Sequence, residues 1–159
     1  MESNTKELTL IRIFDAPRAL VWKAWTDPKL LAEWWGPRGV TNPVCEFDAT
    51  QGGKIHIVML AGETLGDLTG ARWPMKGEIQ EITEPLRLVF TSRALRDGDE
   101  YPILETLCTV TFVEEGNKTK MTLHVVVTKA TVEAEDPLKG MKMGWSQSLD
   151  KLGEFLAEQ

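Results

Sequence analysis

The sequence predicts an α+β domain in which a curved antiparallel sheet of about seven strands surrounds a long C-terminal helix. Three observations support this fold class. Two short helical segments, each led by proline, follow a first strand; a long middle region alternates with the period-two pattern of strands; and an amphipathic helix closes the chain. With 159 residues, 42% of them apolar, the chain is long enough for one domain with a sizeable core. A strongly curved sheet cannot contact a helix along its whole length, so we expect an apolar gap between them.

Proline and glycine residues separate the N-terminal elements. Leu8–Phe14 is apolar and β-branched, which predicts a strand. Pro17–Thr26 then has the pattern of a helix, with proline in its first turn. Asp27 is placed to cap a second short helix that starts at Pro28 and ends at Gly36–Gly39. These two helices carry four of the six tryptophans, so we expect them to lie against a wide apolar surface.

Six further segments have strand patterns. The predicted strands are Val44–Asp48, Lys54–Leu60, Trp73–Thr83, Leu86–Ser92, Ile103–Val113 and Lys118–Thr128. Thr50–Gly53 predicts a tight hairpin turn, and Glu84-Pro85 a proline turn. The segments Ala61–Gly70 and Arg93–Glu100 are polar or charged and are predicted to be loops.

The last hairpin predicts which face of the sheet is apolar. A turn at Glu114–Asn117 places Val113 opposite Lys118. In that register the apolar pairs are Val110 with Met121 and Cys108 with Leu123. The other face receives polar residues, among them His124, which we therefore predict to be a surface histidine.

The C-terminal segment provides the helix that covers the apolar face. Its apolar residues recur every three or four positions: Leu138, Met141, Trp145, Leu149, Leu152 and Leu156. Asp136-Pro137 fits a cap and a first-turn proline, so we expect the helix to start at Pro137 and Thr131–Glu135 to form a loop or a separate turn. Gly140 and Gly144 lower the helix propensity of the first half, which then depends on tertiary packing.

Charge and composition exclude several functional classes. The net charge is −6 with no run of five like charges, which argues against nucleic-acid or anionic-membrane binding. No signal peptide and no membrane-spanning stretch are evident. Cys45 and Cys108 are predicted to be buried free thiols of a cytoplasmic protein, with a disulfide or a metal pair as the alternative. We expect neither a metal nor a cofactor, because His56 and His124 are the only histidines and no metal-binding spacing occurs.

Several separated segments resemble the START-like (SRPBCC) superfamily, and within it the branch named for the activator of the heat-shock-protein-90 ATPase. The segments are Phe14–Pro28, Trp34–Pro37, Gly52-Gly53, Glu84–Phe90 and Gly144–Leu152. The resemblance implies a helix-grip fold: a seven-stranded antiparallel sheet, two small helices and a long C-terminal helix around a hydrophobic cavity, as a single domain over residues 1–159 with its core at about 8–157. The sequence departs from the branch pattern at Pro137, because branch members usually run into the last helix without interruption. It implies function only loosely, because the superfamily includes lipid and hormone binders, cyclases, hydrolases and chaperone regulators.

Aromatic and sulfur-containing residues are the candidate site residues. Those predicted to line the cavity are Trp25, Trp34, Trp35, Met59, Trp73, Met75, Phe90, Cys108, Met141 and Trp145. The alternative is that they fill the core, which we favour for Trp25 and Trp145. Trp34, Trp35 and Trp73 stand beside Gly/Pro-rich breaks, where a ring often lies at a cavity mouth. We therefore expect Trp34→Ala to weaken ligand binding and Trp25→Ala to weaken folding.

No catalytic motif is present in the sequence, such as a Gly-x-Ser-x-Gly elbow or a phosphate-binding glycine loop. The carboxylates of Glu46, Asp48, Glu78 and Glu105 are predicted to be solvated. The first hypothesis is non-catalytic binding of a small hydrophobic or amphipathic molecule, such as a lipid, by a monomer or homodimer. The second is a protein-interaction module that regulates a heat-shock chaperone ATPase in the stress response. The third is a cavity enzyme that acts on a hydrophobic substrate: a cyclase, dehydratase or hydrolase.

Overall fold

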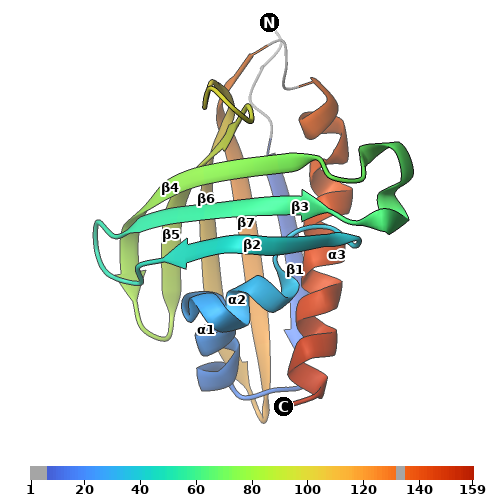
Figure 1. Cartoon of the computed structure of the whole chain (residues 1–159). Helices are drawn as coiled ribbons and strands as arrows, with labels where there is room; N and C mark the ends of the chain where they lie inside the picture. Colours follow the sequence, from blue (N-terminus) through green and yellow to red (C-terminus); the bar gives the residue numbers. More distant parts are fainter. Residues whose placement is uncertain (1–6, 132–134) are drawn as a thin grey trace, which may run out of the picture.

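A computed structural model describes residues 7–131 and 135–159, with an antiparallel sheet curved around a C-terminal helix (Figure 1). The seven strands are hydrogen-bonded in the order β1-β7-β6-β5-β4-β3-β2. Their bounds are β1 Glu7–Phe14, β2 Val40–Phe47, β3 Lys54–Ala61, β4 Arg72–Thr83, β5 Arg87–Leu95, β6 Pro102–Glu115 and β7 Lys118–Ala130. The first strand therefore returns to pair with the last, and the α+β helix-grip architecture predicted from the sequence is confirmed.

Two short helices and one long helix lie on the concave side of the sheet. Their bounds are α1 Arg18–Thr26, α2 Pro28–Trp34 and α3 Glu135–Ala157, and a 3-10 helix, η1 Glu63–Leu68, lies within the predicted 61–70 loop. In Figure 1, α1 and α2 cover one end of the curved sheet while α3 runs along its length. The predicted cap is confirmed, because the Asp27 carboxylate accepts a hydrogen bond from the Lys29 amide at 2.9 Å. None of the helices in the described part of the chain is long and apolar enough to cross a bilayer.

The start of α3 differs slightly from the prediction. The helix begins at Glu135 instead of Pro137, so the proline occupies the first turn. A first-turn residue has no partner for its amide in the preceding turn, and the missing N–H of proline therefore breaks no helical hydrogen bond. Of the predicted loop, Thr131 is non-helical and its amide donates to the Ile103 carbonyl at 3.1 Å, while residues 132–134 lie outside the described part.

The register of the last hairpin was predicted wrongly by two residues. Val113 lies opposite Lys120, and Glu115 opposite Lys118, so Val110 pairs with Leu123 instead of Met121, and Cys108 with Val125. The reason is the turn, which uses only Gly116 and Asn117 between the strands. A shift of two residues keeps every side chain on its predicted face. His124 accordingly lies on the outer face, where its Nε2 is 2.8 Å from a Glu7 carboxylate oxygen.

Most strands extend beyond their predicted bounds, and the extensions of β2 and β5 have a clear cause in the sequence. Strand β2 begins at Val40 instead of Val44, because a bulge between Thr41 and Val44 interrupts the alternation next to Pro43. Strand β5 continues to Leu95, so part of the predicted Arg93–Glu100 loop is strand. Arg93 faces solvent there, and its charge masks the strand pattern in the sequence.

Candidate functional site

The concave face of the sheet has two ends that differ in packing. At one end, which we call the packed end, the sheet meets α1, α2 and the second half of α3. The side chains between them have almost no accessible surface: Val21, Trp25, Leu31, Trp34, Leu88, Val110, Phe112, Met121, Leu123, Leu149 and Leu152. At the other, the open end, six residues of the same face are only half-buried, although neighbours such as Met75 and Leu104 are buried: Met59, Trp73, Ser92, Ala94, Met141 and Trp145. The first four lie on β3, β4 and β5, and the last two on the first half of α3.

Part of the open end is lined by small inward residues. The strand register aligns Gly77, Ser92 and Thr106 in one row across β4, β5 and β6. The neighbouring row at the packed end instead carries Ile79 and Phe90. The first half of α3 carries the exposed Gly140 and the half-buried Gly144, and a Cβ added at either meets no atom within 4 Å apart from its own stretch of helix. The sheet and the first half of α3 therefore both lack bulk at this end.

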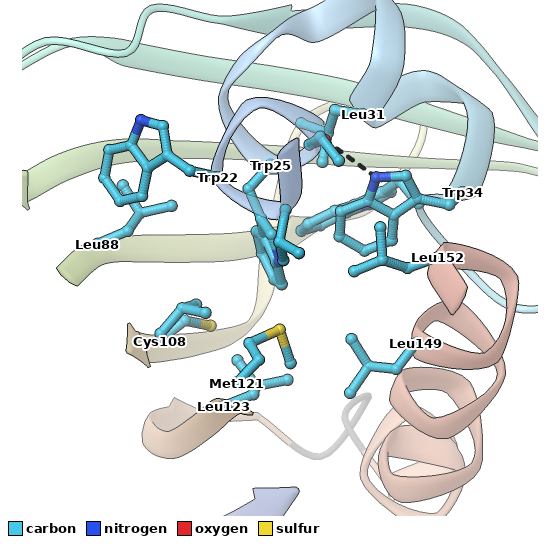
Figure 2. Packing of buried hydrophobic residues seen from close by; sticks show 14 of the residues in the cluster. Trp22, Trp25, Leu31, Trp34, Leu88, Cys108, Met121, Leu123, Leu149 and Leu152 are labelled. Carbon is cyan, nitrogen blue, oxygen red and sulfur yellow. Dashed lines mark hydrogen bonds between the residues drawn. The ribbon is translucent and has the colours of Figure 1, made fainter. Parts of the chain in front are cut away.

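The packed end is filled by rings from α1 and α2. Trp25 and Trp34 have no exposed surface, and their ring centroids are 4.8 Å apart in an edge-to-face arrangement. The Trp34 Nε1 donates a hydrogen bond to the Ala24 carbonyl of α1 at 3.0 Å, marked by the dashed line in Figure 2. Trp34 is thus a core residue that joins the two helices, and its predicted position at a cavity mouth is wrong. The Gly/Pro break beside it ends the helix but leaves the preceding ring pointing inward.

An aromatic cluster connects the two ends. Trp25 contacts Phe90 and Trp35, with centroid distances of 6.3 and 6.5 Å. It also stacks on Trp145 at 6.2 Å with an interplanar angle of 21°. Trp35 meets the same Trp145 edge-on at 5.2 Å. Because Trp145 keeps accessible surface while Trp25 has none, the cluster marks the boundary between the open and packed ends.

The predicted site residues divide between core and accessible surface. Those that are buried are Trp25, Trp34, Trp35, Met75, Phe90 and Cys108, and those that remain half-buried are Met59, Trp73, Met141 and Trp145. The structure joins Trp25, Trp34, Trp35, Phe90 and Trp145 in one network of ring contacts. Met59 and Trp73 form a separate pair opposite each other on β3 and β4.

Polar residues of the inner face were missed in the sequence. Ser92 is half-buried, and Thr106 is buried with its Oγ1 3.7 Å from the Cys108 Sγ. Both follow the alternation that places Phe90 and Cys108 inward, so extending the period-two pattern by one step would have found them. They add hydroxyl groups to an otherwise apolar surface.

The ionisable groups of the site have little capacity for acid–base or nucleophilic chemistry. Burial raises the pKa of the Cys108 thiol to about 12, and burial together with nearby Glu46 raises that of Cys45 to about 11, so both are protonated at neutral pH. The four carboxylates considered in the sequence are at least partly exposed, and Glu78 is paired with Lys54 at 2.8 Å. Within residues 7–131 and 135–159, no three His, Cys, Asp or Glu side chains are grouped to hold a metal.

A separate hollow of about 280 Å³ lies on the other side of α1. Its lining residues are Ala19, Trp22, Lys23, Thr26, Ala49, Ile82 and Glu84. None of the predicted site residues lines it.

Comparison with known proteins identifies the same fold throughout the chain. The family model described as "Activator of Hsp90 ATPase homolog 1-like protein" matches residues 15–157. No functionally curated protein matches the sequence significantly. Among solved structures, the AHSA1 protein of Silicibacter pomeroyi is 26% identical with a TM-score of 0.78, and the match covers 96% of this chain and 98% of that one. A protein of Arthrobacter aurescens, solved by NMR in solution, is 25% identical with a TM-score of 0.79, covering 96% and 87% of the two chains. A protein of Chromobacterium violaceum is 26% identical with a TM-score of 0.77, covering 94% and 96%.

Proposed function

The chain belongs to the Activator of Hsp90 ATPase homolog 1-like family, and we propose that within this fold it binds a small hydrophobic or amphipathic molecule at the open end of the concave face. The observation that carries the proposal is the half-buried state of Met59, Trp73, Met141 and Trp145 on a face whose other end is fully packed. Met59, Met141 and Trp145 pack against the core with one side and keep accessible surface on the other. Partly exposed apolar side chains of this kind are typical of a ligand site.

The chemistry of the lining favours an adaptable apolar ligand. Methionine side chains are flexible and polarizable, so Met59 and Met141 suit ligands of irregular shape. Trp73 and Trp145 offer flat faces against which an acyl chain or a ring can lie. The hydroxyls of Ser92 and Thr106 would meet a polar group of the same molecule.

The proposal is tested by filling the open end. Ala94 faces inward on β5 and is half-buried, whereas its neighbour Arg93 is exposed on the outer face of the same strand. A fluorescent apolar probe, 8-anilinonaphthalene-1-sulfonate, is titrated into the wild type, Ala94→Phe and Arg93→Phe, and then displaced with a library of lipids and aromatic metabolites. We expect binding and displacement in the wild type and in Arg93→Phe, and a loss of both in Ala94→Phe. Equal binding by the two variants, or no displacement by any compound, would refute the proposal.

The two alternative functions have weaker support. Regulation of a chaperone ATPase rests on the family description, and ATPase rates of the chaperone with and without the protein decide it. A cavity enzyme needs an inward acid or base, whereas the accessible inward groups named above are apolar or hydroxyl-bearing and both thiols are protonated. The proposal includes a cytoplasmic location, which the free thiols of Cys45 and Cys108 favour.

A further inference from the structure

A donor without a partner lies at the boundary between the two ends. Among the described residues, two buried side-chain polar atoms have no hydrogen-bond partner, the Trp25 Nε1 and the Asn42 Oδ1. The Asn42 amide nitrogen donates to the carbonyls of Ala32 and Trp35 at 3.0 and 2.9 Å, so this residue belongs to the junction of α2 and β2. The Trp25 Nε1 belongs instead to the aromatic cluster.

The surroundings of Trp25 make its unpaired N–H informative. The aromatic rings around it are those of Trp34, Trp35, Phe90 and Trp145, whose faces are only weak acceptors. Figure 2 shows the indole extending from α1 into the space between the sheet and α3, while the nitrogen of neighbouring Trp34 is engaged by α1. A buried donor without an acceptor is costly, and in native proteins such groups usually have a partner.

We propose that the Trp25 N–H is the polar recognition point of the ligand site and donates to a neutral carbonyl oxygen of a hydrophobic ketone, ester or amide. This inference rests on the proposed function, since the apolar part of the ligand would lie at the open end. The stacked ring of Trp145 separates that end from Trp25, and Trp145 keeps accessible surface. The indole N–H lies in the plane of the Trp25 ring, whereas Trp145 stacks on the face of that ring. Binding therefore requires the rings packed around Trp25 to shift until the carbonyl lies beside the N–H.

A neutral carbonyl fits this position better than a carboxylate. A buried carboxylate needs a cation or several donors to replace its hydration. The cation that faces inward on β1, Arg12, is already paired with Asp150 of α3 at 2.6 Å. A single indole donor satisfies one carbonyl acceptor and leaves no charge uncompensated.

The test compares two ligands that differ at the carbonyl. The probes are 2-undecanone and the hydrocarbon 1-undecene, titrated into the wild type and into Trp25→Phe, which keeps a ring but removes the N–H. Trp34→Phe is the matched control, because its lost N–H bonds to Ala24 within the protein. We expect Trp25→Phe to weaken binding of the ketone by roughly 3- to 10-fold and to leave binding of the hydrocarbon within about 2-fold. Trp34→Phe should change the binding of both ligands by the same factor.

A second measurement follows the indole signals of the wild-type protein and uses Trp25→Phe only to assign them. The six tryptophans give six indole N–H signals in a ¹H–¹⁵N correlation spectrum, and Trp25→Phe assigns the relevant one. We expect that signal to move downfield with the ketone and to lack this hydrogen-bond shift with the hydrocarbon.

The outcomes separate the two proposals. If both ligands bind but the Trp25 signal does not respond to the carbonyl, the inference is wrong and the binding function stands. A Trp25 signal already at a hydrogen-bonded position in the free protein, and unchanged by the ketone, would mean a buried water is the partner and would also overturn it. If neither ligand binds and the library displaces no probe, the binding function itself fails.

Discussion

The packed and open ends of the concave face are built from the same sheet and the same helix, yet only one of them is filled. At the packed end, α1 and α2 insert Trp22, Trp25 and Trp34, each at most 5% exposed. At the open end none of the described helices forms such a pair over the sheet, and the residues there include Gly77 on β4, Ala94 on β5 and Gly144 on α3. The comparison indicates that one curved sheet can hold a rigid core and an accessible site when residue size changes along its strands.

The first prediction concerns tryptophans at opposite ends. Trp34→Ala removes a fully buried ring and its hydrogen bond to Ala24, and we expect it to lower the free energy of unfolding by about 3–5 kcal/mol. Trp73→Ala, at the half-buried open end, should lower it by only about 1 kcal/mol. Urea denaturation followed by circular dichroism measures both. Similar losses for the two variants would mean that the ends do not differ in packing.

The second prediction applies the same contrast within α3. Leu149 has no exposed surface, so Leu149→Ala should cost about 2–5 kcal/mol of stability. Met141, two turns earlier, is half-buried, and Met141→Ala should cost about 1 kcal/mol while weakening displacement of the fluorescent probe. Denaturation and probe titration on the same samples give both quantities. A larger stability loss for Met141→Ala than for Leu149→Ala would show that the first half of α3, and not the second, is the tightly packed half.

Much of this architecture could be predicted because the local signals were strong. Prolines and Asp27 defined α1 and α2, and the spacing of apolar residues defined α3. The faces of β6 and β7 were correct despite the wrong register, because a two-residue shift preserves side-chain direction. The spacing of residues within each element was therefore enough to predict the fold.

The candidate site was less predictable because it depends on what lies opposite each residue. The sequence shows that Trp34 stands before a Gly-Pro break, but not that its N–H reaches the Ala24 carbonyl of another helix. The open end results from an absence of bulk, at Gly77 and Ala94 on the sheet and Gly144 on the helix. These positions come together only through the register of the sheet and the path of α3.

The third prediction sharpens the contrast by adding methyl groups to α3. A Cβ at Gly144 meets nothing within 4 Å, so Gly144→Ala should gain helix propensity and stabilise the protein by about 0.5–1 kcal/mol. At the packed end, a Cβ at Gly153 lies 3.5 Å from a Phe14 ring carbon. Gly153→Ala gains the same helix propensity and adds a methyl group in van der Waals contact with that ring, so its gain should be at least as large. Urea denaturation compares the two variants, and a loss of stability in Gly144→Ala would contradict the assignment of free space beside Gly144 in the first half of the helix.

The smallest effect is expected from the ion pair that fastens the segment after α2 to the packed half of α3. The Arg38 guanidinium donates to both carboxylate oxygens of Glu154, and this hydrogen bonding, with the positive charge of Arg38, holds the pKa of Glu154 below its ordinary value of 4.5. A carboxyl group with a lowered pKa binds fewer protons in the folded state than in the unfolded state. Its stabilising contribution is therefore complete above pH 4.5 and is lost as the pH falls through the folded-state pKa.

Removing this carboxylate should reduce the acid sensitivity of the protein. We expect the urea midpoint of Glu154→Gln to fall less steeply than that of the wild type as the pH is lowered from about 5 to about 3. The pair is exposed and screened by solvent, so the difference should be small and should shrink further in high salt. Glu158→Gln is the control, since Glu158 is exposed on the last turn and has no ion pair with a described residue. An equal change in slope for both variants would show that net charge, and not the contact between Arg38 and Glu154, governs the acid response.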